Sequence, residues 1–411
     1  MSNLLLLIFT LLIPLENKTS TWFNFGGGLN LTTIFLILIF ISLFFVNKQK
    51  SSFIVKNPLN FPILLFIVLT YFSLWTGFFK YGISAFGEEF HAYKRFITTF
   101  ILFYLVIGSV NTKKNSEILI KAMSFMVFII ALTVLKEYME SGIWHYNEES
   151  RITLLGMNPN YLGSLFAQFI PIFAASFFLL KSIRSKILNL ILFSIGLFAL
   201  FFTYSRGAYL AIVGALLVMG FLGGKKSFIG TILLVLMVLC ASAILFGHGR
   251  IIPVSVRERF ESIKQEETVD NSIESRKFVW SIAREDILKS PLFGYGYGAT
   301  RRDLPIDVHN MYLKIAYDCG IPTLLLFIYI LLKAFLITIK VFRMAQDDFS
   351  RVIALGFLGC LVALIIGNYF GERLGLFSAN GYFAILLGIV IVMYSEQNKI
   401  MRLKKSKIID K

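Results

Sequence analysis

The segment FALFFTYSRGAYLAIVGA, residues 198–215, places one arginine between two apolar runs, each long enough to form part of a membrane-spanning helix. An unpaired guanidinium within the hydrocarbon of a bilayer is costly, so such residues are rare and either functional or placed at the interface, where they reach water. The meaning of Arg206 therefore depends on its depth, which follows from where the surrounding spans begin and end.

The apolar composition extends over the whole chain. The 411 residues are 57% hydrophobic and 16% aromatic with a mean hydropathy of +0.75, whereas a soluble domain is about 45–50% apolar. A hydrocarbon core about 30 Å thick needs about 20 apolar residues in a helix. The sequence predicts an all-α polytopic membrane protein with about twelve spans, near residues 4–15, 30–46, 60–79, 95–111, 116–135, 158–180, 187–203, 207–222, 227–246, 320–340, 352–368 and 378–394. We interpret the short first run as a retained span, because no Lys or Arg precedes it and no small-residue cleavage site follows.

The connections between these spans differ in their basic residues. The cytoplasmic side of a membrane protein carries the excess of Lys and Arg in its short loops. One alternate set holds 19 Lys and Arg, at 47–58, 112–116, 181–187, 223–226, 340–351 and 395–411, and the other holds 8. Both termini are therefore expected in the cytoplasm, in a multi-pass protein of the cytoplasmic (inner) membrane. The net charge of +16 is then largely a topology signal that also favours anionic membrane lipids, and nucleic acid is not an expected partner.

This topology divides the chain into four parts. Residues 1–246 hold the first nine spans, 247–319 form one long extracytoplasmic loop, 320–395 hold the last three spans, and 396–411 form a basic cytoplasmic tail. Within the loop, a helical pattern around KFVWSIAREDIL is followed by a proline and closely spaced glycines. We expect amphipathic helices lying over the outer face, and any chemistry on that side, because ionisable residues are scarce in the spans.

Arginines near the outer face are candidates for binding an anion. Arg206 falls at the outer junction of the seventh and eighth spans, and the small Gly207 and Ala208 would let an anionic group approach its guanidinium and the backbone N–H groups. The alternative is an interfacial arginine that reaches headgroup phosphates. Arg276 and Arg284 lie in the amphipathic segment, either as binding residues or on a solvated helix face.

His309 stands in DVHNMYLKIAYDCGIPT, directly before the tenth span, in a polar-then-apolar setting that the other three histidines lack. Such a histidine is either structural or a proton acceptor near the membrane surface. The sequence has no DxD motif and no His/Asp cluster at ligand spacing, so neither a metal nor a cofactor is expected.

Four of these segments, taken in order, resemble one family. RITLLGMNPNYLG, TYSRGAYLA, ESRKFVWSIAREDILKSPLFGYGYG and HNMYLKIAYDCGIPT are similar to segments of the O-antigen ligase and polymerase superfamily, over roughly residues 150–370. The resemblance implies a GT-C-like membrane glycosyltransferase that moves a glycan from undecaprenyl diphosphate to an acceptor hydroxyl on the outer face of the membrane. Arg206 and Arg276 match the family's diphosphate-binding arginines and His309 its essential histidine. Secondary candidates from the same segments are Arg151, Asn158, Asn160, Arg284, Asn310 and Gly320.

These residue types suit such a transfer. Arginine binds phosphate oxygens bidentately and stays charged when desolvated, so it stabilises a diphosphate leaving group without a metal. A histidine with an ordinary pKa near 6.5 can accept the proton of the attacking hydroxyl, and direct attack would invert the anomeric carbon. The aromatic segment PLFGYGYG either lines the sugar path or belongs to an interfacial aromatic belt.

The resemblance leaves the acceptor open. The ligase pattern of a histidine, ten residues and then G-x-x-T-G is met by His309, Gly320 and Thr323, but the final position is Leu324. A ligase would deliver the glycan to lipid A-core in lipopolysaccharide biosynthesis, a polymerase would lengthen it on its lipid carrier, and a protein-glycosylating relative is a third possibility. A transporter or flippase for the same lipid-linked glycan is the alternative of a different class. Ion-coupled transport usually needs ionisable residues within the helices, and their scarcity favours an enzyme.

Overall fold

The computed structural model describes residues 2–23, 25, 29–46, 56–141, 151–224, 227, 229, 230, 232 and 271–409. Within these ranges the chain is built from helices, and the β structure consists of isolated bridge residues, among them the pair Leu154 and Met157. Ten of the described helical segments are long and apolar enough to cross a membrane. The prediction of an all-α polytopic membrane protein is confirmed.

Ten of the twelve predicted spans coincide with these segments. The first continues through a 3-10 turn, so that its helix extends over Ser2–Trp22. The second is the shorter apolar helix α3, Leu31–Val46. The ninth prediction, 227–246, lies almost entirely outside the described residues, as does the first part of the long loop, 247–270.

The spans form three groups along the chain. The first group consists of α1 (Ser2–Leu12), α2 (Glu16–Trp22), α3, α4 (Asn60–Tyr81), α5 (Ile83–Ser109) and α6 (Lys113–Ser141). The second consists of α7 (Pro159–Leu179), α8 (Ile183–Phe201) and α9 (Arg206–Gly223). The third consists of α15 (Ile321–Met344), α16 (Asp348–Tyr369) and α17 (Phe377–Ile409).

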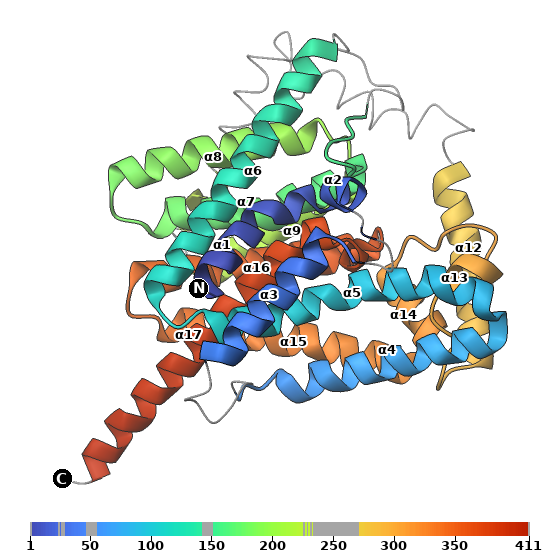
Figure 1. The fold of residues 1–411 in the computed structure, drawn as a ribbon. Coiled ribbons are helices and arrows are strands. Elements are labelled where there is room, and N and C mark those ends of the chain that lie inside the picture. The colour runs from blue at the N-terminus through green and yellow to red at the C-terminus, as the bar shows by residue number, and fades with distance from the viewer. Residues whose placement is uncertain are drawn as a thin grey trace.

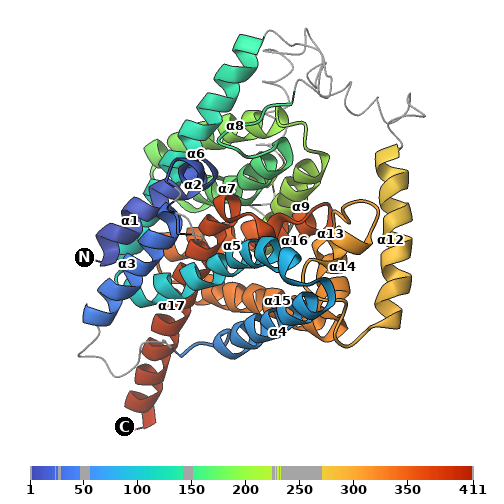
Figure 2. The same cartoon turned by 45° about the vertical axis from the view of Figure 1, so that its right-hand side comes forward.

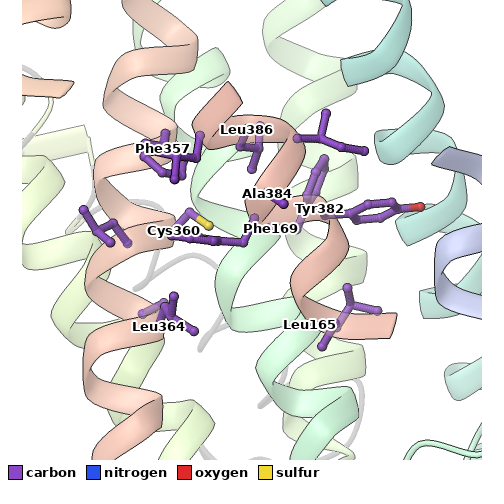
Figure 3. Close-up of a cluster of buried hydrophobic side chains, with 14 of the residues drawn as sticks. Leu165, Phe169, Phe357, Cys360, Leu364, Tyr382, Ala384 and Leu386 are labelled. Carbon is purple, nitrogen blue, oxygen red and sulfur yellow. The ribbon is translucent and has the colours of Figure 1, made fainter. Parts of the chain in front are cut away.

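Helices α7, α16 and α17 form the centre of the bundle. Of their apolar stretches, 83%, 72% and 89% respectively are buried by other protein segments, compared with 28% for the peripheral α8. Figure 3 shows side chains of these three helices meeting, with the rings of Phe169 and Tyr382 centred 5.8 Å apart. A Cβ added to Gly356 would lie 2.8 Å from the Cα of Ile172. Small residues thus let the helices approach closely, as expected where lipid supplies no hydrophobic drive for association.

The segment before α15 folds over one end of the bundle. It contains α12 (Asn271–Lys289), α13 (Ala299–Asp303) and α14 (Met311–Cys319). Figures 1 and 2 show α12 running across the ends of α4 and α5, on the side opposite both chain termini. Helix α12 buries Val279, Ala283 and Ile287 against this segment and exposes Phe278 and Leu288. The prediction of a helix around KFVWSIAREDIL is confirmed.

A glycine-rich loop fastens this cap to the bundle. Gly294, Gly296 and Gly298 all adopt positive φ angles, a conformation that glycine reaches without steric cost. The N–H of Tyr297 donates to the carbonyl oxygen of Ser73 in α4 at 2.9 Å. The carboxylate of Asp318 accepts from the backbone N–H groups of Gly298 (3.1 Å) and Thr300 (2.9 Å). The helix thus ends at the proline and glycines, as expected, and the loop that follows is ordered by hydrogen bonds to α4 and α14.

Candidate functional site

His309 lies at the junction of the cap helices. It directly precedes α14, whose N-cap residue Asn310 accepts hydrogen bonds from the N–H groups of Tyr312 (3.0 Å) and Leu313 (3.1 Å). On its other side, the carbonyl oxygen of Val308 accepts from Trp280 Nε1 of α12 at 2.7 Å. His309 itself is exposed and has a φ of 46°, a conformation that is uncommon outside glycine. Two helices thus position this imidazole at the surface of the cap.

Among the charged groups around His309, Arg276 has the largest effect on the pKa of the imidazole. It lies four residues before Trp280 on α12, and residues at that spacing share a helix face. Partial desolvation by the surrounding protein is the main cause that lowers the pKa of His309 below its ordinary 6.5, and Arg276 lowers it further, followed by Arg373. Asp307 and Glu372 act in the opposite direction. With a lowered pKa, the imidazole is neutral at pH 7 and available as a proton acceptor.

A second group of candidates joins the starts of α7 and α9. The Oδ1 atom of Asn160 accepts from Arg151 Nη2 and from Ser205 Oγ, both at 3.0 Å. Asn158 is the N-cap of α7 and accepts from the N–H of Tyr161 at 3.0 Å. Ser205 directly precedes Arg206, the first residue of α9. Asn160 therefore holds Arg151 close to the segment that carries Arg206.

The small residues after Arg206 do not leave the open approach that we expected for an anion. A Cβ added to Gly207 would lie 2.9 Å from the Cβ of Phe370, and one added to Gly163 would lie 3.0 Å from the Cβ of Ala208. The N–H of Ala208 donates to the carbonyl oxygen of Ser205 at 3.0 Å. That expectation is wrong, because the small side chains let α9 pack against α7 and the end of α16.

Arg373, which the sequence did not single out, lies at the same end of the bundle. It sits in the turn between α16 and α17 and is only 6% exposed, with its guanidinium carbon 5.5 Å from the centre of the Tyr161 ring. Burial lowers the pKa of Arg373 to about 10, Tyr161 raises it, and the charges of Arg276 and Arg151 lower it further. The one sequence signal was a lone arginine in a short outward loop between two strongly apolar spans.

An acidic residue next to Arg373 is engaged by a lysine. Lys314 Nζ lies 3.2 Å from Glu372 Oε2 and 3.8 Å from Asp318 Oδ2, and donates to Thr300 Oγ1 at 3.0 Å. Burial favours the neutral amine, but the charges of Asp318 and Glu372 raise the pKa of Lys314. Burial raises the pKa of Asp318 to about 6, although Lys314 opposes this shift. This buried group links α14 to the turn that carries Arg373.

Residues 191–328 match the family model described as O-antigen ligase. Over this range the chain is similar to the O-antigen ligase and polymerase superfamily. The resemblance drawn from the sequence is thereby confirmed. No curated protein matches the chain.

The matched range contains only part of the candidate site. Arg206, Arg276 and His309 lie inside the matched range, whereas Arg151 and Arg373 lie outside it. The match also includes the end of the cap that joins α14 to α15. The site therefore combines segments of the matched domain with helix ends on both sides of it in the sequence.

Two secondary candidates, Arg284 and Gly320, lie apart from these charged groups. Arg284 is exposed on α12, two turns beyond Arg276. Gly320 separates α14 from α15 with a φ of 87°, and a Cβ at this position would lie 2.3 Å from the carbonyl oxygen of Leu292. Thr323 Oγ1 donates to the carbonyl oxygen of Cys319 at 2.8 Å. The glycine and threonine of the ligase pattern thus shape the helix junction that follows His309.

The tyrosines of PLFGYGYG pack within the protein. The rings of Tyr295 and Tyr317 stack with centres 4.9 Å apart, and that of Tyr297 meets Tyr93 at 5.3 Å. Leu292 and Phe293 are each 63% exposed, as suits residues that contact lipid at the membrane surface. In the part of the chain that the structure describes, no cluster of three or more His, Cys, Asp or Glu could hold a metal ion. The concentrated charge at this site is positive, which suits an anionic ligand.

Proposed function

We propose that this protein transfers a glycan from undecaprenyl diphosphate to an acceptor hydroxyl at the extracytoplasmic face of the membrane. The observation that supports the proposal most directly is the electrostatic effect of Arg276 on His309. An exposed imidazole with a lowered pKa stands within the electrostatic reach of a half-buried guanidinium. A proton acceptor beside an anion-binding group is the arrangement that transfer from a phosphate-activated sugar requires.

In this reaction the acceptor oxygen attacks the anomeric carbon of the first sugar. The bond from that carbon to the diphosphate oxygen breaks, and the diphosphate leaves with the electron pair. Neutral His309 takes the hydroxyl proton, and Arg276 and Arg206 stabilise the charge that develops on the leaving group. Each well-placed positive contact of this kind contributes on the order of 10² to 10³ in rate. Attack opposite the leaving group inverts the anomeric centre, and no step requires a metal.

The acceptor we propose is lipid A-core, which makes the protein a ligase-like transferase. The support is the spacing from His309 to Gly320 and Thr323, although Leu324 stands where the pattern has glycine. The alternative within the superfamily is a polymerase, for which the acceptor is a second lipid-linked glycan. Both use the same donor and the same proton acceptor, so the experiment must separate the acceptors.

Transfer by the purified protein in nanodiscs tests the proposal. The donor is an undecaprenyl diphosphate-linked oligosaccharide, and lipid A-core is added or omitted. The wild type is compared with His309→Ala, Arg206→Ala and Arg276→Ala. Matched controls are His91→Ala and Arg184→Gln, at exposed positions on α5 and α8.

We expect transfer only when lipid A-core is present, with a loss of at least 100-fold in the three site variants and none in the controls. Longer glycans formed without lipid A-core would assign a polymerase. If the wild-type protein is folded and binds the donor but transfers nothing in either condition, the result would contradict the proposed enzymatic function and favour a transporter. Full turnover by His309→Ala would remove the proton-acceptor role.

A further inference from the structure

Arg373 is a buried cation without an ion pair. Its side chain is 6% exposed, and no ion pair to a carboxylate is formed at this position among the residues that the structure describes. Arginine stays protonated in proteins, so the group carries its charge into the interior. A buried charge that lacks a counter-charge is strongly unfavourable. An uncharged side chain at this position would avoid that cost, yet the protein has an arginine there.

The adjacent carboxylate does not serve as the counter-charge. Glu372 is the next residue in the chain, but its carboxylate lies 3.2 Å from Lys314 Nζ. Lys314 also has Asp318 as a partner at 3.8 Å. The local acids are therefore grouped around the lysine, and the Arg373 guanidinium contacts the ring face of Tyr161.

The turn that carries Arg373 is built to hold its side chain in place. The N–H of Leu374 donates to Asn368 Oδ1 at 3.2 Å, and Asn380 Nδ2 donates to the carbonyl oxygen of Arg373. A Cβ added to Gly371 would lie 2.8 Å from the Arg373 guanidinium carbon. The glycine leaves the space that the guanidinium occupies, so the backbone fixes the position of the charge.

Two other cations lie within electrostatic range of Arg373. The charges of Arg276 on α12 and Arg151 before α7 both act on it. Like charges in a partly dry site repel one another, and an anion that binds between them removes the repulsion. A diphosphate diester carries two negative charges and four non-bridging oxygens, which match several guanidinium forks better than one.

We propose that Arg373 binds the diphosphate of the lipid-linked donor directly, with Arg276 and Arg151 on the other sides of the same anion. This inference rests on the proposed function, since it assigns a third anchoring residue for that donor. It places the diphosphate between the turn that joins α16 to α17, the N-terminal half of α12 and the loop before α7. The glycan's first sugar then lies toward His309, because the charge of Arg276 acts on both His309 and Arg373.

Binding of undecaprenyl diphosphate to the full-length protein in detergent tests the inference. The shift in unfolding temperature on titration gives the affinity, with undecaprenyl monophosphate as the comparison ligand. The variants are Arg373→Gln and Arg373→Lys, with Arg184→Gln as the control. We expect Arg373→Gln to weaken diphosphate binding on the order of 10- to 100-fold and to reduce the preference over the monophosphate. The diphosphate affinity of Arg373→Lys should lie between those of the wild type and Arg373→Gln, because lysine retains the charge without the bidentate fork.

The ligand-free proteins separate binding from a structural role. An unfolding temperature for ligand-free Arg373→Gln that is equal to or above that of the wild type supports the inference, because the variant loses only an unpaired buried charge. A marked fall in that temperature, with diphosphate affinity unchanged in what remains folded, would show that Arg373 is structural. Wild-type protein that binds no undecaprenyl diphosphate would overturn both this inference and the proposed function. Wild-type binding and transfer that Arg373→Gln retains in full would overturn this inference alone.

Discussion

The backbone of His309 is strained, and its neighbours hold the strain in place. A φ of 46° costs a residue with a Cβ about 1–2 kcal/mol. The adjacent bonds, from the N-cap of Asn310 to α14 and from Trp280 to the carbonyl oxygen of Val308, fix the residues on both sides. Strain of this kind is concentrated at functional sites, where the surrounding structure determines the conformation. The position of the imidazole is thus set by α12 and α14 together.

In the proposed mechanism, the pH dependence of transfer reports the protonation of His309. Protonated imidazole cannot accept a proton, so kcat/KM should fall as the pH drops through the His309 pKa. Partial desolvation and Arg276 lower that pKa, so the acidic limb is expected below pH 6.5. Asp307 raises the pKa, and its negative charge favours the imidazolium. Asp307→Asn should therefore move the limb to lower pH, and Arg276→Gln should move it to higher pH.

The measurement is kcat/KM between pH 5 and 8 for the wild type and both variants. Glu285→Gln, at an exposed position on α12, is the control and should leave the limb in place. An acidic limb that is unchanged in both Asp307→Asn and Arg276→Gln would assign the titration to a group other than His309.

At the scale of helices, the junction after α14 is a tightly packed point of the cap. A single residue, Gly320, ends α14 and begins α15, and the N–H of Ile321 donates to the carbonyl oxygen of Pro291 at 2.7 Å. The backbone of Leu292 occupies the place where a side chain at residue 320 would lie. The angle between α14 and α15, and with it the placement of His309, thus depends on a residue without a Cβ.

Gly320→Ala should destabilise the folded protein by about 3 kcal/mol or more. The added Cβ meets backbone 2.3 Å away and the φ of 87° strains any side chain, so both overpacking and left-handed strain contribute. The check is the unfolding temperature in detergent without ligand. Gly375→Ala is the matched control, because a Cβ there meets nothing within 4 Å. A Gly320→Ala variant of normal stability that has lost transfer would instead give Gly320 a role in the chemistry.

At the scale of the whole molecule, the sequence predicted what depends on local pattern. The apolar runs predicted the spans because a bilayer fixes the required helix length, and the pattern of residues 277–288 predicted α12. Packing between distant segments could not be predicted in this way. The sequence predicted that Gly207 leaves room for an anion, because Phe370, which packs against it in the fold, is far away in the chain. Arg373 was missed because its burial depends on Tyr161 and the ends of two other helices.

The distribution of basic residues predicts how the molecule lies in its membrane. Figure 1 places the two chain termini at one end of the bundle and the cap of α12 to α14 at the other. Lys and Arg concentrate in the connections at 181–187 and 340–351 and in the C-terminal tail. The positive-inside rule then directs the termini to the cytoplasm and His309 to the outside. Under the proposed function, the lipid-linked donor would then reach His309 from the outer leaflet.

Cysteine labelling in spheroplasts tests this orientation. Cys319 and Cys360 are buried and should not react in the folded protein, and Cys240→Ala removes the remaining thiol. Ile306→Cys introduces a thiol in the cap and Arg351→Cys one at the opposite end, both at exposed positions. A membrane-impermeant maleimide should label Ile306→Cys directly and Arg351→Cys only after the membrane is permeabilised. The reverse pattern would place the His309 site in the cytoplasm, where an outer-leaflet donor and a lipid A-core acceptor would be excluded.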